Sequence, residues 1–141
     1  MKSIVICGSQ RFKEEIETFA KLLERKGVPV VFRPEFRDRT SEMANKPESE
    51  RLMNDEYKLK VPGLVHAHLQ RIRESDVCYV YNKNGYIGVN TTLEIGFAHG
   101  LNKIIYTLES ESKFEEGGEL CRQILFNKVI KDPNELYDKL R

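Results

Sequence analysis

The stretch "DVCYVYNKNGYIGVNTTLEIGFAHGLNKIIYTL", residues 76–108, contains the order of elements that decides the fold. Its two ends, "DVCYVY" and "KIIYTL", are short runs rich in β-branched and aromatic residues, which are typical of buried strands. Between them, a glycine-rich loop leads into a helical pattern. Two strands joined through a helix lie parallel in one sheet, so this stretch predicts a parallel sheet with a helix packed on it.

The same alternation runs through the rest of the chain. We predict strands at residues 3–7, 28–32, 76–81, 103–108 and 127–131, with helical patterns between them and a terminal helix from about residue 133. Alternating strands and helices favour an α/β fold in which helices cover both faces of a parallel sheet. The length of 141 residues suits a single domain that covers residues 1–141.

One segment, residues 34–60, interrupts this alternation with many charged residues. It is too long for an ordinary connection and predicts a loop, with a short helix after Pro47. Two interpretations stay open, a solvated insertion or a lid over a binding site.

The composition argues against several classes of function. Lys and Arg total 23 and Asp and Glu 22, whereas proteins that bind nucleic acid polymers usually have a basic surplus. No run approaches the roughly 20 apolar residues that span a bilayer, and the N-terminal apolar run is too short for a signal peptide. The three cysteines and three histidines lack metal-type spacing. We therefore expect a cytoplasmic protein with reduced cysteines and without a metal, a cofactor or a membrane partner.

Two loops follow the strand ends at which parallel α/β sheets bind ligands. Such sheets bind ligands beyond the carboxyl ends of the strands, where the strand order reverses. This rule selects the loop after the first strand, residues 8–11, and the loop after the third strand, residues 82–92. In the first loop, Gly8 permits a tight turn, Ser9 offers an N–H and a hydroxyl, and Arg11 supplies a positive charge. These groups predict an anion site, and the alternative is that Ser9 only caps the following helix.

Glu94, which follows the second loop in "NTTLEIG", has two interpretations. Thr91 and Glu94 match the capping box S/T-x-x-E, in which the glutamate closes the first turn of a helix. A carboxylate near a helix N-terminus is also held ionised, which makes it a serviceable nucleophile for glycosyl transfer. Gly96, inside the same helix, indicates close approach by a ligand or by a neighbouring strand. The position of the loop beside the first one favours the nucleophile.

His68 is the candidate partner of this nucleophile, because glycosyl transfer needs a proton donor for the leaving group. It lies three residues after Val65 and four before Ile72, at the edge of the buried face of the predicted helix. The alternative interpretation is a structural histidine at the margin of the core.

Three stretches in chain order, "CGSQR", "SDVCYVY" and "TLEIGFAHGLNKIIY", resemble the nucleoside 2-deoxyribosyltransferase family. "ICGSQRF" is most similar to the strand-one loop of its branch of 2'-deoxynucleoside 5'-phosphate N-hydrolases. The resemblance covers most of the chain and implies a three-layer, doubly wound α/β fold with a five-stranded parallel sheet, of the Rossmann-like or flavodoxin-like kind. It also implies a homodimer or a higher homo-oligomer, with sites completed across the interface.

The resemblance also implies roles for single residues. Glu94 matches the family's catalytic glutamate, which attacks C1' of the deoxyribose, and Ser9 and Arg11 match the loop at the 5' end of the sugar. His68 falls where the family typically has an aspartate. That aspartate is implicated in proton transfer or sugar binding.

Together these observations predict an N-glycosidic-bond enzyme that transfers or hydrolyses deoxyribosyl groups of nucleosides or nucleoside 5'-monophosphates. Glu94 is the predicted nucleophile and His68 the predicted acid. The substrate-binding residues are expected to be Gly8, Ser9, Arg11, Tyr86, Gly88 and Asn90, although Tyr86 has the alternative of an exposed loop aromatic. Because His68 departs from the family pattern, the alternative function is a non-catalytic nucleotide-binding module on the same fold.

Overall fold

The computed structural model describes residues 1–36 and 46–141. Among these residues, five strands form one sheet, in which all neighbouring strands are parallel and the order is β2-β1-β3-β4-β5. The predicted α/β fold with a five-stranded parallel sheet is confirmed. The strands are β1 (Ile4–Cys7), β2 (Val31–Phe32), β3 (Val77–Val80), β4 (Ile104–Thr107) and β5 (Lys128–Val129).

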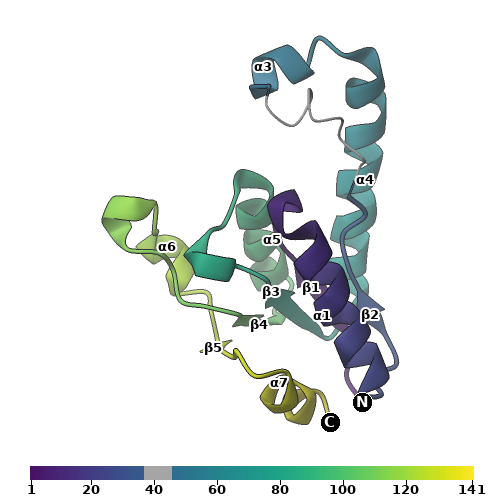
Figure 1. Cartoon of the computed structure of the whole chain (residues 1–141), viewed down its shortest axis with the longest axis vertical. Helices are drawn as coiled ribbons and strands as arrows, with labels where there is room; N and C mark the ends of the chain where they lie inside the picture. Colours follow the sequence, from purple (N-terminus) through teal and green to yellow (C-terminus); the bar gives the residue numbers. More distant parts are fainter. Residues whose placement is uncertain (37–45) are drawn as a thin grey trace.

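Helices cover both faces of this sheet, giving the three predicted layers (Figure 1). Side chains alternate between the two faces of a strand, so β1 and β3 each contribute to two separate hydrophobic clusters. One cluster includes residues of α1 (Lys13–Arg25) and α7 (Pro133–Leu140). The other includes residues of α4 (Asp55–Glu74) and α5 (Val89–Gly100). Cys7 of β1 and Cys78 of β3 belong to this second cluster.

The end of α1 explains why the second strand is shorter than predicted. Gly27 has a φ of +101° and donates its N–H to the Glu24 carbonyl, and Val28 donates its N–H to the Leu23 carbonyl. This pair of bonds is a Schellman motif, for which glycine is favoured at the left-handed position. Because the N–H of Val28 closes the helix, it is not available to the sheet, and β2 begins only at Val31.

The largest correction concerns residues 34–60. The short helix α3 (Glu48–Arg51) follows Pro47 as predicted, but α4 already begins at Asp55, where a loop was expected. The side chain of Asn54 accepts a hydrogen bond from the Tyr57 N–H at 2.9 Å, which caps the helix and sets its start. Residues 37–45 lie outside the described part of the chain, and the lid interpretation stays a prediction. The N-terminal half of α4 extends well beyond the sheet, together with α3 (Figure 1).

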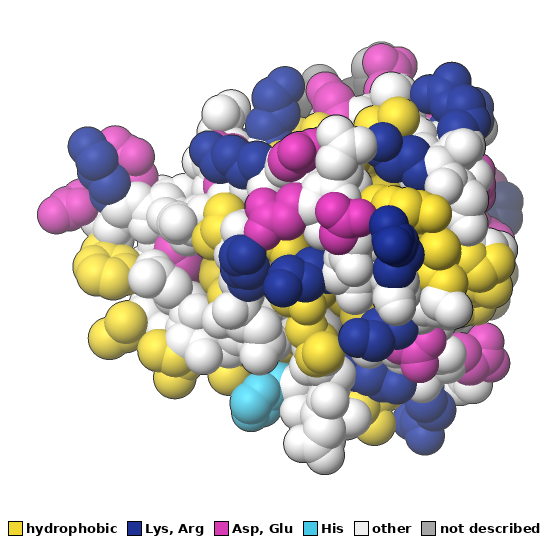
Figure 2. Space-filling model, turned by 90° about the horizontal axis from the view of Figure 1, so that it is seen from below, with side chains coloured by type: hydrophobic (Ala, Val, Ile, Leu, Met, Phe, Trp, Pro, Cys, Tyr) yellow, Lys and Arg dark blue, Asp and Glu magenta, His cyan; other side chains and the backbone are white. Residues whose placement is uncertain are grey.

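The remaining elements are short and connect the layers. They are the 3-10 turns η1 (Gln10–Phe12), η2 (Lys83–Gly85) and η3 (Phe114–Glu116) and the helix α6 (Leu120–Gln123). No helix in the described ranges is both long enough and apolar enough to cross a bilayer. On the face that Figure 2 shows, basic and acidic side chains alternate with hydrophobic ones, in keeping with the near balance of charges in the sequence.

Candidate active site

The strand order reverses between β1 and β3, and the two loops selected from the sequence begin there. Cys7 pairs with Val80 in the register of these strands, and the Tyr81 N–H donates to the Cys7 carbonyl at 2.8 Å. The chain leaves β1 toward β2 on one side and leaves β3 toward β4 on the other. The two loops therefore start side by side at a topological switch point, where open α/β sheets bind ligands.

Three side chains from three elements meet beside the end of β1. Cys7 ends β1, His68 lies on α4 and Glu94 lies on α5. His68 Nε2 is 3.4 Å from Cys7 Sγ and 3.7 Å from Glu94 Oε2. Cys7 Sγ also lies 3.6 Å from the Sγ of Cys78. The two residues predicted to be catalytic, Glu94 and His68, are thus brought together. Their neighbour is Cys7, one of the cysteines for which the sequence predicted only the reduced state.

Residue spacing on the two helices explains this convergence. His68 lies one turn before Ile72, and Glu94 lies one turn before Ala98 and three residues after Thr91. Ile72, Ala98 and Thr91 are all buried, so His68 and Glu94 project from the inward faces of α4 and α5. The two helices pack against each other over the same face of the sheet, which brings the two side chains into contact.

Burial favours the neutral form of each group in this trio. It raises the pKa of Glu94 to about 8, although a hydrogen bond from Cys7 acts in the opposite direction. Burial and the nearby charge of Arg71 lower the pKa of His68 to about 4. A hydrogen bond with Cys78, together with burial, raises the pKa of the Cys7 thiol. At neutral pH the trio therefore holds a thiol, a neutral imidazole and a protonated carboxyl group, so the contact between His68 and Glu94 is not an ion pair.

For Glu94, the alternative interpretation as a helix cap and the expectation of an ionised carboxylate are both wrong. The N-cap of α5 is Gly88, and no side chain caps this helix, so the capping box of Thr91 and Glu94 does not form. Glu94 is the sixth residue of α5, beyond the first turn in which the helix dipole stabilises a negative charge. Burial, which favours the protonated form, then decides the pKa of the carboxyl group.

Two polar atoms of the trio have no hydrogen-bond partner among the residues that the structure describes. They are Glu94 Oε2 and His68 Nδ1, and both are buried. An unsatisfied buried polar group costs about 1–3 kcal/mol, and buried polar groups are nearly always paired. Glu94 Oε2 and His68 Nδ1 therefore have hydrogen-bonding capacity that the described residues do not use.

Gly8 and Ser9 connect Cys7 to the short 3-10 turn η1, and Ser9 has an extended backbone. A Cβ at Gly8 would lie 2.8 Å from Ile16 Cδ1 and 3.1 Å from the Tyr81 carbonyl oxygen, so a larger residue requires these neighbours to shift. The Ser9 hydroxyl accepts a hydrogen bond from the Arg11 N–H at 3.3 Å. Ser9 thereby caps the short turn η1. It does not cap α1, whose N-cap residue is Phe12 and whose first turn receives no side-chain hydrogen bond from that residue.

Arg11 and Tyr86 connect the first loop to the second. The guanidinium carbon of Arg11 lies 3.5 Å from the centroid of the Tyr86 ring, a cation–π contact. The ring of Phe12 meets the same tyrosine edge-on at 6.1 Å. Tyr86 is 37% exposed, as its alternative interpretation as an exposed loop aromatic expects, and it also contacts Arg11 and Phe12.

The other expected residues of the second loop lie around the start of α5. Gly88 accepts a hydrogen bond from the Thr92 hydroxyl at 2.8 Å, and Asn90 is exposed on the first turn. A Cβ at Gly96 would meet no atom of the described residues within 4 Å, so the alternative in which this glycine packs against a neighbouring strand is wrong. No contact joins Asn90 to the trio in the described structure.

Asn82 is a structural residue that the sequence analysis missed. It is fully buried, its side-chain amide donates to the Glu109 carbonyl at 2.8 Å, and its side-chain oxygen accepts from the Glu109 N–H at 2.9 Å. These two bonds tie the loop after β3 to the loop after β4. An asparagine directly after a buried strand was the only signal for this role.

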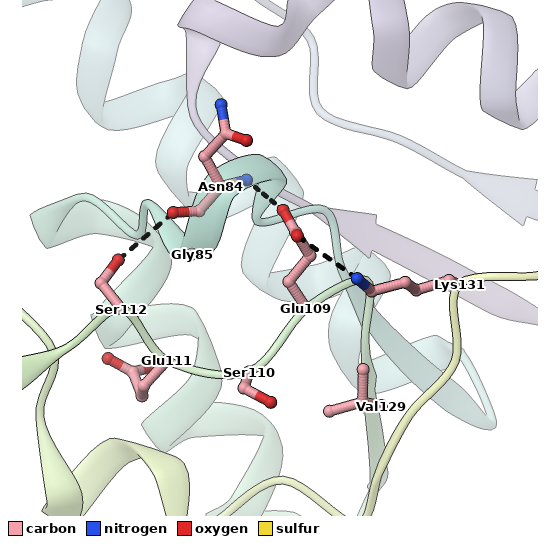
Figure 3. Close-up of a pocket in the computed structure, with 8 residues that line it drawn as sticks. All are labelled: Asn84, Gly85, Glu109, Ser110, Glu111, Ser112, Val129 and Lys131. Atoms are coloured by element: carbon pink, nitrogen blue, oxygen red, sulfur yellow. Dashed lines mark hydrogen bonds and ion pairs between the residues drawn. The ribbon is translucent and has the colours of Figure 1, made fainter.

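A cavity of about 410 Å³ opens next to this tie, between the loops that follow β3 and β4 and the end of β5 (Figure 3). Its floor is polar: the Glu109 carboxylate accepts from the Asn84 N–H and lies 3.6 Å from Lys131 Nζ. None of the predicted site residues lines this cavity. It is therefore separate from the trio.

The comparison with solved structures supports the fold. No family model matches the chain, and no curated protein matches it. Among solved structures, a 2-deoxyribosyltransferase from the psychrotolerant bacterium Bacillus psychrosaccharolyticus has a TM-score of 0.59 at 15% identity, over 96% of this chain and 90% of that chain. The CMP N-glycosidase BcmB of Clostridium botulinum matches with a TM-score of 0.48 at 18% identity, over 99% and 97% of the two chains. The flavoenzyme NAD(P)H:(acceptor) oxidoreductase FerB of Paracoccus denitrificans matches with a TM-score of 0.50 at 12% identity, over 99% and 95%.

The chain therefore has the three-layer fold found in a 2-deoxyribosyltransferase, as predicted. A similar fold also occurs in the flavoenzyme FerB, and function resides in sites and not in folds. The identities of 12–18% mean that any activity of this chain has to be argued from its own residues.

Proposed function

We propose that the chain is an N-glycosidic-bond enzyme in which Glu94 attacks C1' of a nucleoside or nucleoside 5'-monophosphate. The observation that carries the proposal is the convergence of Glu94 and His68 at the switch point, with Glu94 Oε2 lacking a hydrogen-bond partner among the described residues. The fold shared with a 2-deoxyribosyltransferase supports it. Glycosyl transfer needs a carboxylate and a group that moves a proton, and the proposal gives these two roles to Glu94 and His68.

In this proposal His68 activates Glu94 by accepting its proton. The carboxyl group is protonated at rest, and His68 Nε2 lies 3.7 Å from Glu94 Oε2, within reach of a small side-chain movement. Burial lowers the pKa of His68 to about 4, so this proton transfer is unfavourable until the substrate reacts. In retaining glycosidases the nucleophile and the acid that protonates the leaving group lie about 5–5.5 Å apart. His68 Nε2 is closer than this to Glu94, at 3.7 Å, and therefore suits proton exchange with Glu94 better than direct contact with the leaving base. The positive charge that develops on the sugar favours ionisation of Glu94 during the reaction.

The proton is conserved through the cycle. Glu94 gives its proton to His68, the glycosidic C–N bond breaks, and a bond forms between Glu94 and C1'. The imidazolium returns the proton through one water molecule to the leaving base, which departs neutral. Attack by water on C1' then releases the sugar and restores the protonated Glu94, whereas attack by a second base completes a transfer.

Arg11 and Tyr86 are the proposed binding groups at the 5' end of the sugar. The cation–π contact places the Arg11 guanidinium over the Tyr86 ring, and an arginine in such a contact can still bind an anion through its N–H groups. A guanidinium can bind two oxygens of a phosphate in a bidentate manner. Gly8, Ser9, Gly88 and Asn90 complete the proposed site.

The test is incubation of the purified protein with a panel of 2'-deoxynucleosides and their 5'-monophosphates, with release of free base measured by chromatography. We expect release from at least one compound, and loss of release in Glu94→Ala and Glu94→Gln. Glu14→Gln is the matched control, because Glu14 is an exposed helical glutamate of α1. Full activity of Glu94→Ala contradicts the proposal. Thermal stabilisation by a nucleotide without base release assigns the alternative, a non-catalytic binding module.

A further inference from the structure

The trio of Cys7, His68 and Glu94 also has the composition of a transition-metal site. It offers a sulfur, an imidazole nitrogen and a carboxylate oxygen, one ligand atom from each residue, all within 4.8 Å of one another. Zn²⁺ binds all three ligand types, at about 2.3 Å for sulfur and about 2.0–2.2 Å for nitrogen and oxygen. Three protein ligands with a fourth position open to water or a small molecule are typical of zinc sites outside purely structural ones.

The distances suit one tetrahedral ion. Bonds of these lengths place neighbouring ligand atoms roughly 3.3–3.8 Å apart when the angles are tetrahedral. The observed separations are 3.4 Å from Cys7 Sγ to His68 Nε2 and 3.7 Å from His68 Nε2 to Glu94 Oε2. The third separation, between Cys7 Sγ and a Glu94 carboxylate oxygen, is within 4.8 Å, so side-chain movements that bring these two atoms to the tetrahedral range complete the site.

The charges suit a divalent ion as well. A thiolate and a carboxylate together carry two negative charges, and the imidazole is neutral, so the complex with a divalent cation has no net charge. A buried charge is tolerated only when an opposite charge compensates it. Here the two negative charges of the ligands balance the two positive charges of the ion. The Glu94 oxygen that lacks a hydrogen-bond partner among the described residues would gain one bond to the ion.

We propose that Cys7, His68 and Glu94 form a three-ligand binding site for Zn²⁺ or a similar thiophilic divalent ion. The site is independent of the catalytic role proposed for Glu94, but the two uses exclude each other, because an ion on Glu94 Oε2 prevents attack on a sugar. Binding replaces the protons of the thiol and the carboxyl group, which leave to solvent. No ligand spacing in the sequence indicates this site, since its residues come from β1, α4 and α5.

The surroundings of His68 Nδ1 indicate how tightly the proposed site should bind a metal ion. Metal-binding histidines usually donate their other ring N–H to a carboxylate or carbonyl, and loss of that partner typically weakens binding about 10- to 100-fold. Among the residues that the structure describes, His68 Nδ1 has no such partner. We therefore expect a reversible site that a chelator empties, and not a permanently occupied structural one.

Titration of the reduced, metal-free full chain with Co²⁺ tests the proposal, because Co²⁺ reports its ligands by absorption. We expect a thiolate-to-cobalt charge-transfer band and the visible bands of a tetrahedral ion, saturating at one ion per chain and displaced by Zn²⁺. Cys7→Ser should lose the charge-transfer band. Cys121→Ser, which removes an exposed cysteine, and Cys78→Ser, which removes the neighbouring thiol, should keep it.

Two further variants keep the test decisive if Cys7→Ser does not fold. His68→Gln and Glu94→Gln each remove one ligand and should weaken Co²⁺ binding by more than the roughly 100-fold upper figure for a lost hydrogen-bond partner. Absence of the charge-transfer band in the wild-type chain overturns the proposal, and so does a band of unchanged affinity in Glu94→Gln. None of these readouts requires glycosidase activity, so failure of the metal site and failure of the proposed function are distinguishable.

Discussion

The Nε2 atom of His68 and the Oε2 atom of Glu94 lie 3.7 Å apart, although the two residues are 26 positions apart in the chain and belong to different helices. Burial favours the neutral form of each group. A neutral imidazole beside a protonated carboxyl group can exchange a proton without creating a net charge inside the protein. Four expectations follow from this pair and from the loops around it.

Substitution of His68 separates proton transfer from binding. His68→Gln cannot accept the proton of Glu94, so base release should fall by about 10²-fold or more, in the range of general acid–base effects. Nucleotide-induced thermal stabilisation should persist. His68→Asp, which restores the residue type of the resembled family, should recover part of the rate, and His66→Gln, an exposed histidine on the same helix, should change nothing. An unchanged rate in His68→Gln would remove His68 from the mechanism.

The pH dependence of stability should reveal the buried carboxyl group. With a folded pKa of about 8 against about 4.5 for the free group, Glu94 binds its proton more tightly when folded. Its contribution to the free energy of unfolding therefore falls as the pH rises through this window. His68, with a folded pKa of about 4 against 6.5 for the free imidazole, acts in the opposite direction, but only below pH 6.5.

The diagnostic interval is thus pH 6.5–8, between the pKa of a free histidine and the folded pKa of Glu94. There the free energy of unfolding of the wild type should decline relative to that of Glu94→Gln, by about one to a few kcal/mol in total. Urea denaturation at several pH values measures both proteins. Parallel curves over this interval would show that Glu94 has an ordinary pKa in the folded state.

Arg11 should distinguish nucleotides from nucleosides. If its guanidinium binds the 5'-phosphate, Arg11→Ala loses hydrogen bonds to a charged group, which are worth about 1.5–3 kcal/mol. The KM for a monophosphate should then rise about 10- to 100-fold, while that for the nucleoside stays nearly unchanged. Arg25→Ala, at an exposed arginine of α1, is the control. Equal losses for both substrates would place the role of Arg11 in the loop structure and not at the phosphate.

Two glycines near the site should respond in opposite directions. Gly8→Ala puts a methyl group 3.1 Å from the Tyr81 carbonyl oxygen and 2.8 Å from Ile16 Cδ1, and should destabilise the protein by about 1–3 kcal/mol. Gly96→Ala meets open space inside α5 and should stabilise it by up to about 1 kcal/mol. Chemical denaturation measures both. A Gly96→Ala protein that is more stable but loses base release would indicate that a ligand approaches this glycine.

The sheet could be predicted because its signals are local. The runs at β1, β3 and β4 are apolar and β-branched, and alternating helices leave few topologies open. The start of α4 was not predicted because the many charged residues of this segment obscured the apolar pattern of a helix. Its signal was also local, a capping asparagine at position 54 followed by two acidic residues.

The sequence by itself determined the order of the elements, the parallel sheet and the two loops at its switch point, since each follows from residue periodicity and turn chemistry. Tertiary structure alone decided the state of Glu94. The carboxyl group has no acidic or basic neighbour in the sequence that would shift its pKa. Only the packing of α5 against α4 and β1 buries it beside His68 and Cys7. Burial, which no residue pattern encodes directly, turned an expected carboxylate into a protonated group and placed a thiol next to it.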